Sequence, residues 1–200
     1  MNSLDMMKQN EPYVISDFDM PKNLQRHARE LCFEYNHLSP KDNDKKRDIL
    51  KSLFGTCSDL TFIESTFNCD YGFNIHTKGL CVINFNTTIL DTSPIYIGSN
   101  VFIAPGVVIA CSGHSLDPIE RSKGIMTSAP ITIGDNVWIG ANATICAGVT
   151  IGANSVIGAG SVVVRDIEEN SVAVGSPAKV IRKINDNDKL MLKKQLDKLS

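Results

Sequence analysis

The spacing of apolar residues changes near residue 60 and divides the chain into two parts. Before that point, apolar side chains recur at steps of three and four residues, which is the period of an amphipathic helix. Two short helices cannot bury both of their apolar faces against each other, so residues 1–60 are expected to form a helical cap that docks onto the rest. Ser39 and Pro40 are expected to start the second helix as N-cap and first-turn residue. The two apolar stripes are Leu24, Ala28, Leu31 and Tyr35, then Ile49, Leu50, Leu53 and Phe54.

From residue 61 onward, an apolar residue returns at every sixth position. The longest run starts at Ile133 and reads IGDNVW, IGANAT, ICAGVT, IGANSV and IGAGSV. The same register starts at Ile97, and a looser set, shifted by two residues, occurs at Ile83, Ile89 and Ile95. Six residues suffice only for a short strand and a tight turn, with the isoleucine inward and Gly, Ala or Asn at a turn with positive φ. Stacked triangular coils would bury a continuous isoleucine ladder, so residues 61–184 are predicted to form an all-β solenoid, a parallel β-helix.

The six-residue register is interrupted once at length. Residues 110–130 are polar and carry Gly and Pro, so they are expected to leave the coil as a protruding loop. Long loops in repeat proteins are usually functional. Residues 185–200 are expected to form a polar helical tail.

Composition excludes several classes of protein without naming a reaction. Hydrophobic residues make up 42% and charged residues 21% of the 200 positions, which is typical of a globular domain. The net charge of -2 disfavours a generally basic nucleic-acid binder. No apolar run suits a signal peptide or a membrane span, so we expect a cytoplasmic protein with no membrane or nucleic-acid partner. The six cysteines form no C-x-x-C pair, which favours reduced thiols over a zinc site or a disulfide scaffold.

Two sets of motifs resemble a known family. The repeats, the segment Ser112-Gly113-His114 and the closing sequence GSPAKVIRKI are similar to the hexapeptide-repeat acyltransferases. The N-terminal segment with YNHLSP resembles the cap of the maltose and galactoside O-acetyltransferases. The resemblance, over about residues 13–184, implies a left-handed parallel β-helix, a homotrimer, and a cleft shared between neighbouring subunits. It implies an enzyme that moves the acetyl group of acetyl-CoA to a hydroxyl of a sugar or glycoside.

Transfer to a hydroxyl requires a base, and histidine suits this role because its ordinary pKa lies near neutrality. Of four histidines, only His114 lies in the loop that interrupts the repeat. By resemblance, His114 takes the proton from the acceptor hydroxyl as that oxygen attacks the thioester directly, without an acyl-enzyme. Cys111, three residues away, could suggest a covalent route, but it occupies a small-residue slot of the repeat.

The resemblance assigns further positions to the two substrates. An amide such as Asn84 can hold the acceptor hydroxyl or donate to charge developing on the thioester oxygen. Asp70 and Thr92 depart from the residues found in some family members, so the acceptor pocket is not a copy of theirs. The acceptor contacts implied are Asp17 (or Asp19), Asp70, Asn84 and Thr92. The acetyl-CoA contacts implied are Asn84, Trp138, Ala141, Ala159, Val164, Arg165, Lys179 and Arg182, with packing against a neighbouring subunit as an alternative for Trp138.

Other functions remain open on the same fold. The β-helical carbonic anhydrases need three histidines around a metal, and the repeat region has only His76 and His114, so no metal is expected. A non-catalytic scaffold or binding module would have little use for the histidine loop or for the basic pair near the C-terminus. An acetyltransferase that acts on a non-sugar acceptor, such as an amine or serine, is the third alternative.

Overall fold

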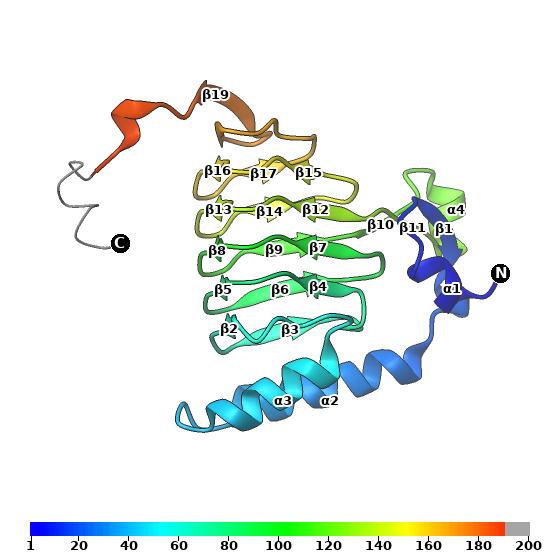
Figure 1. Cartoon of the computed structure of the whole chain (residues 1–200). Helices are drawn as coiled ribbons and strands as arrows, with labels where there is room; N and C mark the ends of the chain where they lie inside the picture. Colours follow the sequence, from blue (N-terminus) through cyan, green and yellow to red (C-terminus); the bar gives the residue numbers. More distant parts are fainter. Residues whose placement is uncertain (191–200) are drawn as a thin grey trace.

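The computed structural model describes residues 1–190, and its centre is a triangular parallel β-helix (Figure 1). Three parallel sheets form its faces, and the chain visits them in turn. Face 1 holds β2 (Thr61–Ile63), β5 (Cys81–Ile83), β8 (Val101–Ile103), β13 (Trp138–Ile139), β16 (Val156–Ile157) and β18 (Ser171–Val174), with β19 (Lys179–Lys183) antiparallel at its end. Face 2 holds β3 (Phe67–Cys69), β6 (Thr87–Leu90), β9 (Val108–Ala110), β14 (Thr144–Ile145) and β17 (Val162–Val163). Face 3 holds β4 (Ile75–Thr77), β7 (Ile95–Ile97), β12 (Ile131–Ile133) and β15 (Thr150–Ile151).

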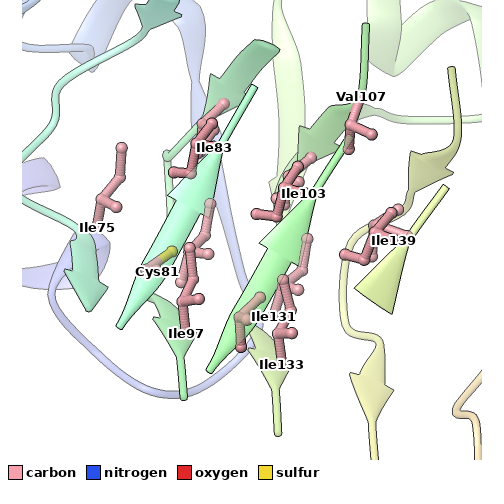
Figure 2. Packing of buried hydrophobic residues seen from close by; sticks show 14 of the residues in the cluster. Ile75, Cys81, Ile83, Ile97, Ile103, Val107, Ile131, Ile133 and Ile139 are labelled. Carbon is pink, nitrogen blue, oxygen red and sulfur yellow. The ribbon is translucent and has the colours of Figure 1, made fainter. Parts of the chain in front are cut away.

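Isoleucines fill the interior in columns, which confirms the predicted ladder (Figure 2). Ile83 lies beside Ile103, and Ile103 beside Ile139, on adjacent strands of face 1. Ile95 and Ile97 belong to the same strand, β7, and both are buried. Ile83 pairs with Ile103 and Ile89 with Ile109 at the same inward position, although each pair joins the two registers. The shift therefore arises from two extra residues at the corner between β6 and β7.

Asparagines turn one corner of successive coils. The φ values are 57° at Asn100, 59° at Asn136, 61° at Asn154 and 56° at Asn170. The amide of Asn136 accepts a hydrogen bond from Asn100 at 3.1 Å and donates one to Asn154 at 2.9 Å. Among the described residues, positive φ occurs only at Asn and Gly, so the expectation that Ala also serves there was wrong.

Helices α2 (Lys22–His37) and α3 (Asn43–Leu53) lie across the end of the first coil (Figure 1). The Tyr35 hydroxyl donates to the carbonyl of Ile63 at 2.6 Å, which fixes α2 on strand β2. The expectation that Ser39 and Pro40 start the second helix was wrong, because α3 starts at Asn43. The Ser39 hydroxyl instead accepts a hydrogen bond from the Lys41 amide in the turn before the helix. The buried stripe of α3 is the predicted one, whereas α2 buries Ala28, Cys32 and Tyr35.

The interruption at residues 110–130 is an ordered structure beside the solenoid, together with α1 (Ser3–Met7) (Figure 1). It contains β10 (Ser112–His114), α4 (Pro118–Ser122) and β11 (Ile125–Ser128). Strand β1 (Tyr13–Ser16) of the cap pairs with β11, which lies between β1 and β10 in an antiparallel sheet, the loop sheet. Of the expected C-terminal tail, η2 (Asp186–Asp188) is a short 3-10 helix, and residues 191–200 lie outside the described part.

Candidate active site

His114 is the last residue of β10, at the free edge of the loop sheet. It lies opposite Met126 of β11, which lies opposite Ile15 of β1. Residues directly opposite in a sheet present their side chains to the same face. Ile15 is buried, Met126 is half-buried and His114 is exposed. No group within residues 1–190 makes a hydrogen bond with the imidazole.

Asp17 continues the line of β1 in the loop sheet. Its amide donates to the carbonyl of Gly124 at 2.8 Å, immediately before β11. It is also the first residue of the 3-10 helix η1 (Asp17–Asp19), so the alternation of strand β1 ends before it. Relative to His114, Asp17 lies two strand spacings of about 4.8 Å across the sheet and two residues along it, because Gly124 precedes Met126 by two positions. Asp19, the alternative, is the last residue of η1.

Asp70 follows β3 at the edge where face 2 meets face 3, called edge 2/3. Burial raises the pKa of the Asp70 carboxyl, and the positive charge of Arg29 acts in the opposite direction. The Asp70 side chain remains half-buried and lines a groove between α2 and face 2. A ligand with hydroxyl groups could reach it there.

Asp91 is a site-forming residue that the sequence analysis did not single out. It follows β6 on the next coil and is fully buried. Its carboxylate accepts hydrogen bonds from the backbone amides of Asp70 at 3.1 Å, Tyr71 at 2.9 Å and Asn74 at 3.3 Å. Burial raises the pKa of Asp91 to about 7 against the effect of these donors. The carboxyl fixes the turn that presents Asp70.

Thr92 lies below the surface in a cluster of hydroxyl groups. Its hydroxyl is 2.7 Å from that of Ser128, which is 2.6 Å from the hydroxyl of Ser93. The Tyr13 hydroxyl donates to the Thr92 carbonyl. All four residues are buried, so the cluster joins the cap strand β1 to the solenoid. An acceptor contact by Thr92 stays a prediction, and it requires a movement that exposes this buried hydroxyl.

The residues predicted to bind acetyl-CoA fall into separate groups. Asn84, Ala141 and Ala159 follow strands of face 1 where it meets face 2, called edge 1/2. The carbonyl of Ala141 accepts the amide of Gly160 at 2.8 Å, so these corners stack. The Asn84 side-chain oxygen accepts the Phe85 amide at 2.8 Å, which leaves its amide nitrogen to donate. Trp138, on face 1 beside this edge, is 54% exposed.

The remaining predicted positions lie elsewhere. Val164 and Arg165 follow β17 at edge 2/3 and are exposed. Lys179 and Arg182 lie on β19, and both are exposed. The Arg182 guanidinium forms two hydrogen bonds with the Asp188 carboxylate, at 2.8 and 2.7 Å.

Residues 1–190 contain no candidate metal site and no candidate membrane-spanning helix. No three or more His, Cys, Asp or Glu side chains are grouped so that they could hold a metal ion. No helix in the same residues combines the length and the apolar character needed to cross a membrane.

Comparisons with known proteins agree with this architecture. Residues 7–58 match the maltose acetyltransferase hexapeptide capping motif, and residues 130–165 match the bacterial transferase hexapeptide (six repeats). The chain is 47% identical to the galactoside O-acetyltransferase of Escherichia coli K12, over 81% of this chain and 80% of that protein.

Solved structures extend the similarity to three dimensions. A galactoside acetyltransferase in complex with coenzyme A is 41% identical, with a TM-score of 0.86 over 90% of this chain and 92% of that one. A maltose O-acetyltransferase from Clostridium difficile 630 is 39% identical, with a TM-score of 0.87 over 93% and 99%. The chain therefore belongs to the maltose and galactoside O-acetyltransferase family of hexapeptide-repeat acyltransferases.

Proposed function

We propose that this chain is an acetyl-CoA-dependent O-acetyltransferase that acts on a hydroxyl of a sugar or glycoside. The observation that carries the proposal is the exposed His114 on the loop sheet at edge 2/3, with Asp17 on the same sheet and Asp70 at the same edge. Carboxylates accept hydrogen bonds from sugar hydroxyls, and a nearby histidine can remove a proton. The similarity to a galactoside acetyltransferase solved with coenzyme A supports both substrate classes.

In the proposed reaction, His114 acts as general base. It takes the proton of the acceptor hydroxyl while that oxygen attacks the thioester carbonyl of acetyl-CoA. The Asn84 amide nitrogen donates to the carbonyl oxygen as negative charge develops there. The carbon–sulfur bond then breaks, the proton passes from His114 to the CoA thiolate, and the acetyl ester leaves.

Direct transfer is favoured over an acyl-cysteine. Cys111 is fully buried, and burial raises the pKa of its thiol far above the ordinary value. A thiolate is the reactive form of cysteine, so this side chain lacks both the charge and the access that a nucleophile needs.

The proposed site requires a second copy of the chain. An amide donor and a base that act on one carbonyl must both lie within a few ångströms of it. In a single chain, Asn84 is at edge 1/2 and His114 at edge 2/3, separated by the width of face 2, whose strands contain two to four residues. At about 3.3 Å per residue, these strands and their turns hold the two groups on the order of 10 Å apart. A neighbouring copy can bring its edge 1/2 to this His114, as in the homotrimer that we propose.

The donor side would extend along edge 1/2. Small side chains at Ala141 and Ala159 leave backbone groups accessible to a pantetheine arm, and Trp138 offers an exposed ring beside them. Val164 and Arg165, at edge 2/3 of the copy that carries His114, would line the opposite wall. Lys179 and Arg182 supply positive charge for the CoA phosphates. Lys179 does so with a compact ammonium group and Arg182 with a planar guanidinium.

The test is release of free thiol from acetyl-CoA across a panel of acceptors. The panel contains glucose, maltose, galactosides, chitooligosaccharides, serine and chloramphenicol, with His114→Ala protein in parallel. We expect thiol release that depends on a sugar and is lost in the variant. Release with serine or chloramphenicol alone would assign a non-sugar acceptor, and failure to bind acetyl-CoA would favour a non-catalytic scaffold.

A further inference from the structure

Two cysteines that are distant in the sequence meet where the cap contacts the solenoid. Cys32 lies on the buried side of α2, and Cys69 is the last residue of β3. Their sulfur atoms are 3.6 Å apart. The two residues are 2% and 6% exposed, so each thiol has the other as its nearest reactive partner. The spacing of the cysteines along the chain does not predict this pair, because the fold creates it.

The environment of the pair favours one thiolate. The Cys69 thiol, acting as donor to Cys32, lowers the pKa of the Cys32 thiol, and burial acts in the opposite direction. The pKa of Cys69 is raised, first by this same interaction and then by burial. Since the thiolate is the nucleophile, this direction favours attack by Cys32 with Cys69 as the resolving thiol, and the same disulfide forms if the two roles are exchanged.

The pair lies beside an open groove. Both cysteines line an open groove of about 540 Å³, whose walls include Arg29, Asn36 and Asp70. Arg29 supplies positive charge beside this groove. The groove is wide enough for a small neutral oxidant.

We propose that Cys32 and Cys69 form a reversible dithiol–disulfide site that, oxidised by hydrogen peroxide, covalently joins helix α2 to strand β3. The Cys32 thiolate attacks one peroxide oxygen, the oxygen–oxygen bond breaks, and a sulfenic acid and hydroxide form. The Cys69 sulfur then attacks the sulfenic sulfur, and the sulfur–sulfur bond forms as water leaves. In total, two thiols and one hydrogen peroxide give one disulfide and two waters. The sulfurs must approach by about 1.5 Å to reach the length of a disulfide bond.

The cross-link would stabilise the contact between cap and solenoid. It restricts the unfolded chain between residues 32 and 69, so the melting temperature is expected to rise by about 5–10 °C. Asp70 is the next residue after Cys69, so the same bond would also fix an acceptor position. This last consequence rests on the proposed function, whereas the disulfide itself does not.

The test uses the full chain, reduced and then treated with about one equivalent of hydrogen peroxide. Remaining thiols are alkylated in denaturant, and peptides are mapped by mass spectrometry without reduction. We expect a peptide that links Cys32 to Cys69, loss of both alkylation sites, and a higher melting temperature that dithiothreitol reverses. Cys146→Ala, which removes a half-buried thiol elsewhere, should retain all three results.

Cys32→Ala and Cys69→Ala should each lose the linked peptide and the difference in melting temperature between oxidised and reduced protein. If one variant does not fold, the peptide map of the unaltered chain still decides. Oxidation confined to Cys57 or Cys146, with Cys32 and Cys69 both alkylated, would overturn the proposal. Acetyl transfer is not measured, so a failure of the proposed function would not change the result.

Discussion

His114 lies directly opposite Met126 across the β10–β11 pair, and this register ties the predicted base to the cap. Met126 also packs against the small apolar cluster of Met7, Tyr13, Ile15, Met20 and Tyr71. Four of these cluster residues come from the N-terminal segment and the fifth comes from the turn next to Asp70. The cap therefore positions the predicted base and one predicted acceptor residue through a single packed cluster.

Replacing His114 by alanine should lower turnover by about 10²–10⁴-fold, the usual contribution of a general base. The side chain is exposed, so the melting temperature should change little. His27→Ala, which removes an exposed histidine from α2, is the matched control and should keep the rate of the unaltered chain. Near-normal turnover in a folded His114→Ala protein would remove His114 from the mechanism.

Gly124→Ala should impair acceptor binding more than stability. Gly124 has φ +75°, and a Cβ there would lie 3.2 Å from the Cβ of Asp17. The left-handed conformation costs about 1 kcal/mol, and Asp17 must shift to make room. We expect KM for the acceptor to rise severalfold.

Gly148→Ala is the control for Gly124→Ala. It has a similar φ of +78°, and its added Cβ would meet only ordinary contact with Ala129 at 3.5 Å. Both variants should lose similar stability in urea unfolding, and only Gly124→Ala should change KM. An equal change of KM in both would attribute the effect to backbone strain and not to Asp17.

The repeat was predictable because each unit carries its own information. Ile139 and Ile145 are placed inside by the six residues around them, with no knowledge of distant parts of the chain. The β1–β11 pairing is different, because Tyr13–Ser16 is too short a pattern to identify a partner beyond residue 120. The start of α3 was missed for a local reason, since Ser39 can cap a turn as well as a helix.

In the predicted site too, some residues are recognisable from local sequence and others only from long-range contacts. His114 was identifiable as the histidine in the long interruption of the repeat, whereas Asp91 is hidden in a corner sequence, LDTSP. Its role depends on three amides of the preceding coil, which only the stacked structure brings to it. For Thr92, the partner Ser128 comes from the end of β11, so its burial also depends on long-range pairing.

Asp91 should make the stability of the chain depend on pH. Its pKa is about 7 in the folded chain, above the value of about 3.9 expected when unfolded. Between these values the folded state binds more protons, so the free energy of unfolding falls as pH rises from about 4 to 7. For this residue alone the decrease is at most about 4 kcal/mol. Urea unfolding at fixed protein concentration, from pH 5 to 8, measures it.

Asp91→Asn provides the comparison for that measurement. The asparagine oxygen can still accept the amides of Asp70 and Tyr71, but its NH₂ group faces the Asn74 amide. The variant should be less stable than the unaltered chain at pH 5 by about 1–3 kcal/mol, the cost of an unsatisfied buried donor. The deficit should shrink toward pH 8. Parallel pH profiles would show that Asp91 stays ionised in the folded chain.

Two substitutions separate the conformational and the hydrogen-bonding contributions of Asn136 to stability. Asn136→Gly removes the two ladder hydrogen bonds but tolerates the φ of 59°. A loss of about 1–2 kcal/mol in unfolding free energy is expected. Asn136→Ala adds the left-handed penalty of about 1 kcal/mol. Equal losses in the two variants would mean that the corner relaxes to another conformation.

The Arg182–Asp188 pair should compete with the phosphates of CoA. The guanidinium is held by both oxygens of Asp188, so these contacts must open before Arg182 can grip a phosphate bidentately. Asp188→Asn should therefore strengthen CoA binding by about two- to fivefold at low salt, and the gain should shrink at high salt.

Calorimetry with Arg182→Ala and the double variant completes the cycle. If Arg182 is the target, Asp188→Asn has no effect in the Arg182→Ala background. Weaker binding in Asp188→Asn would instead mean that Asp188 positions Arg182 for the phosphate.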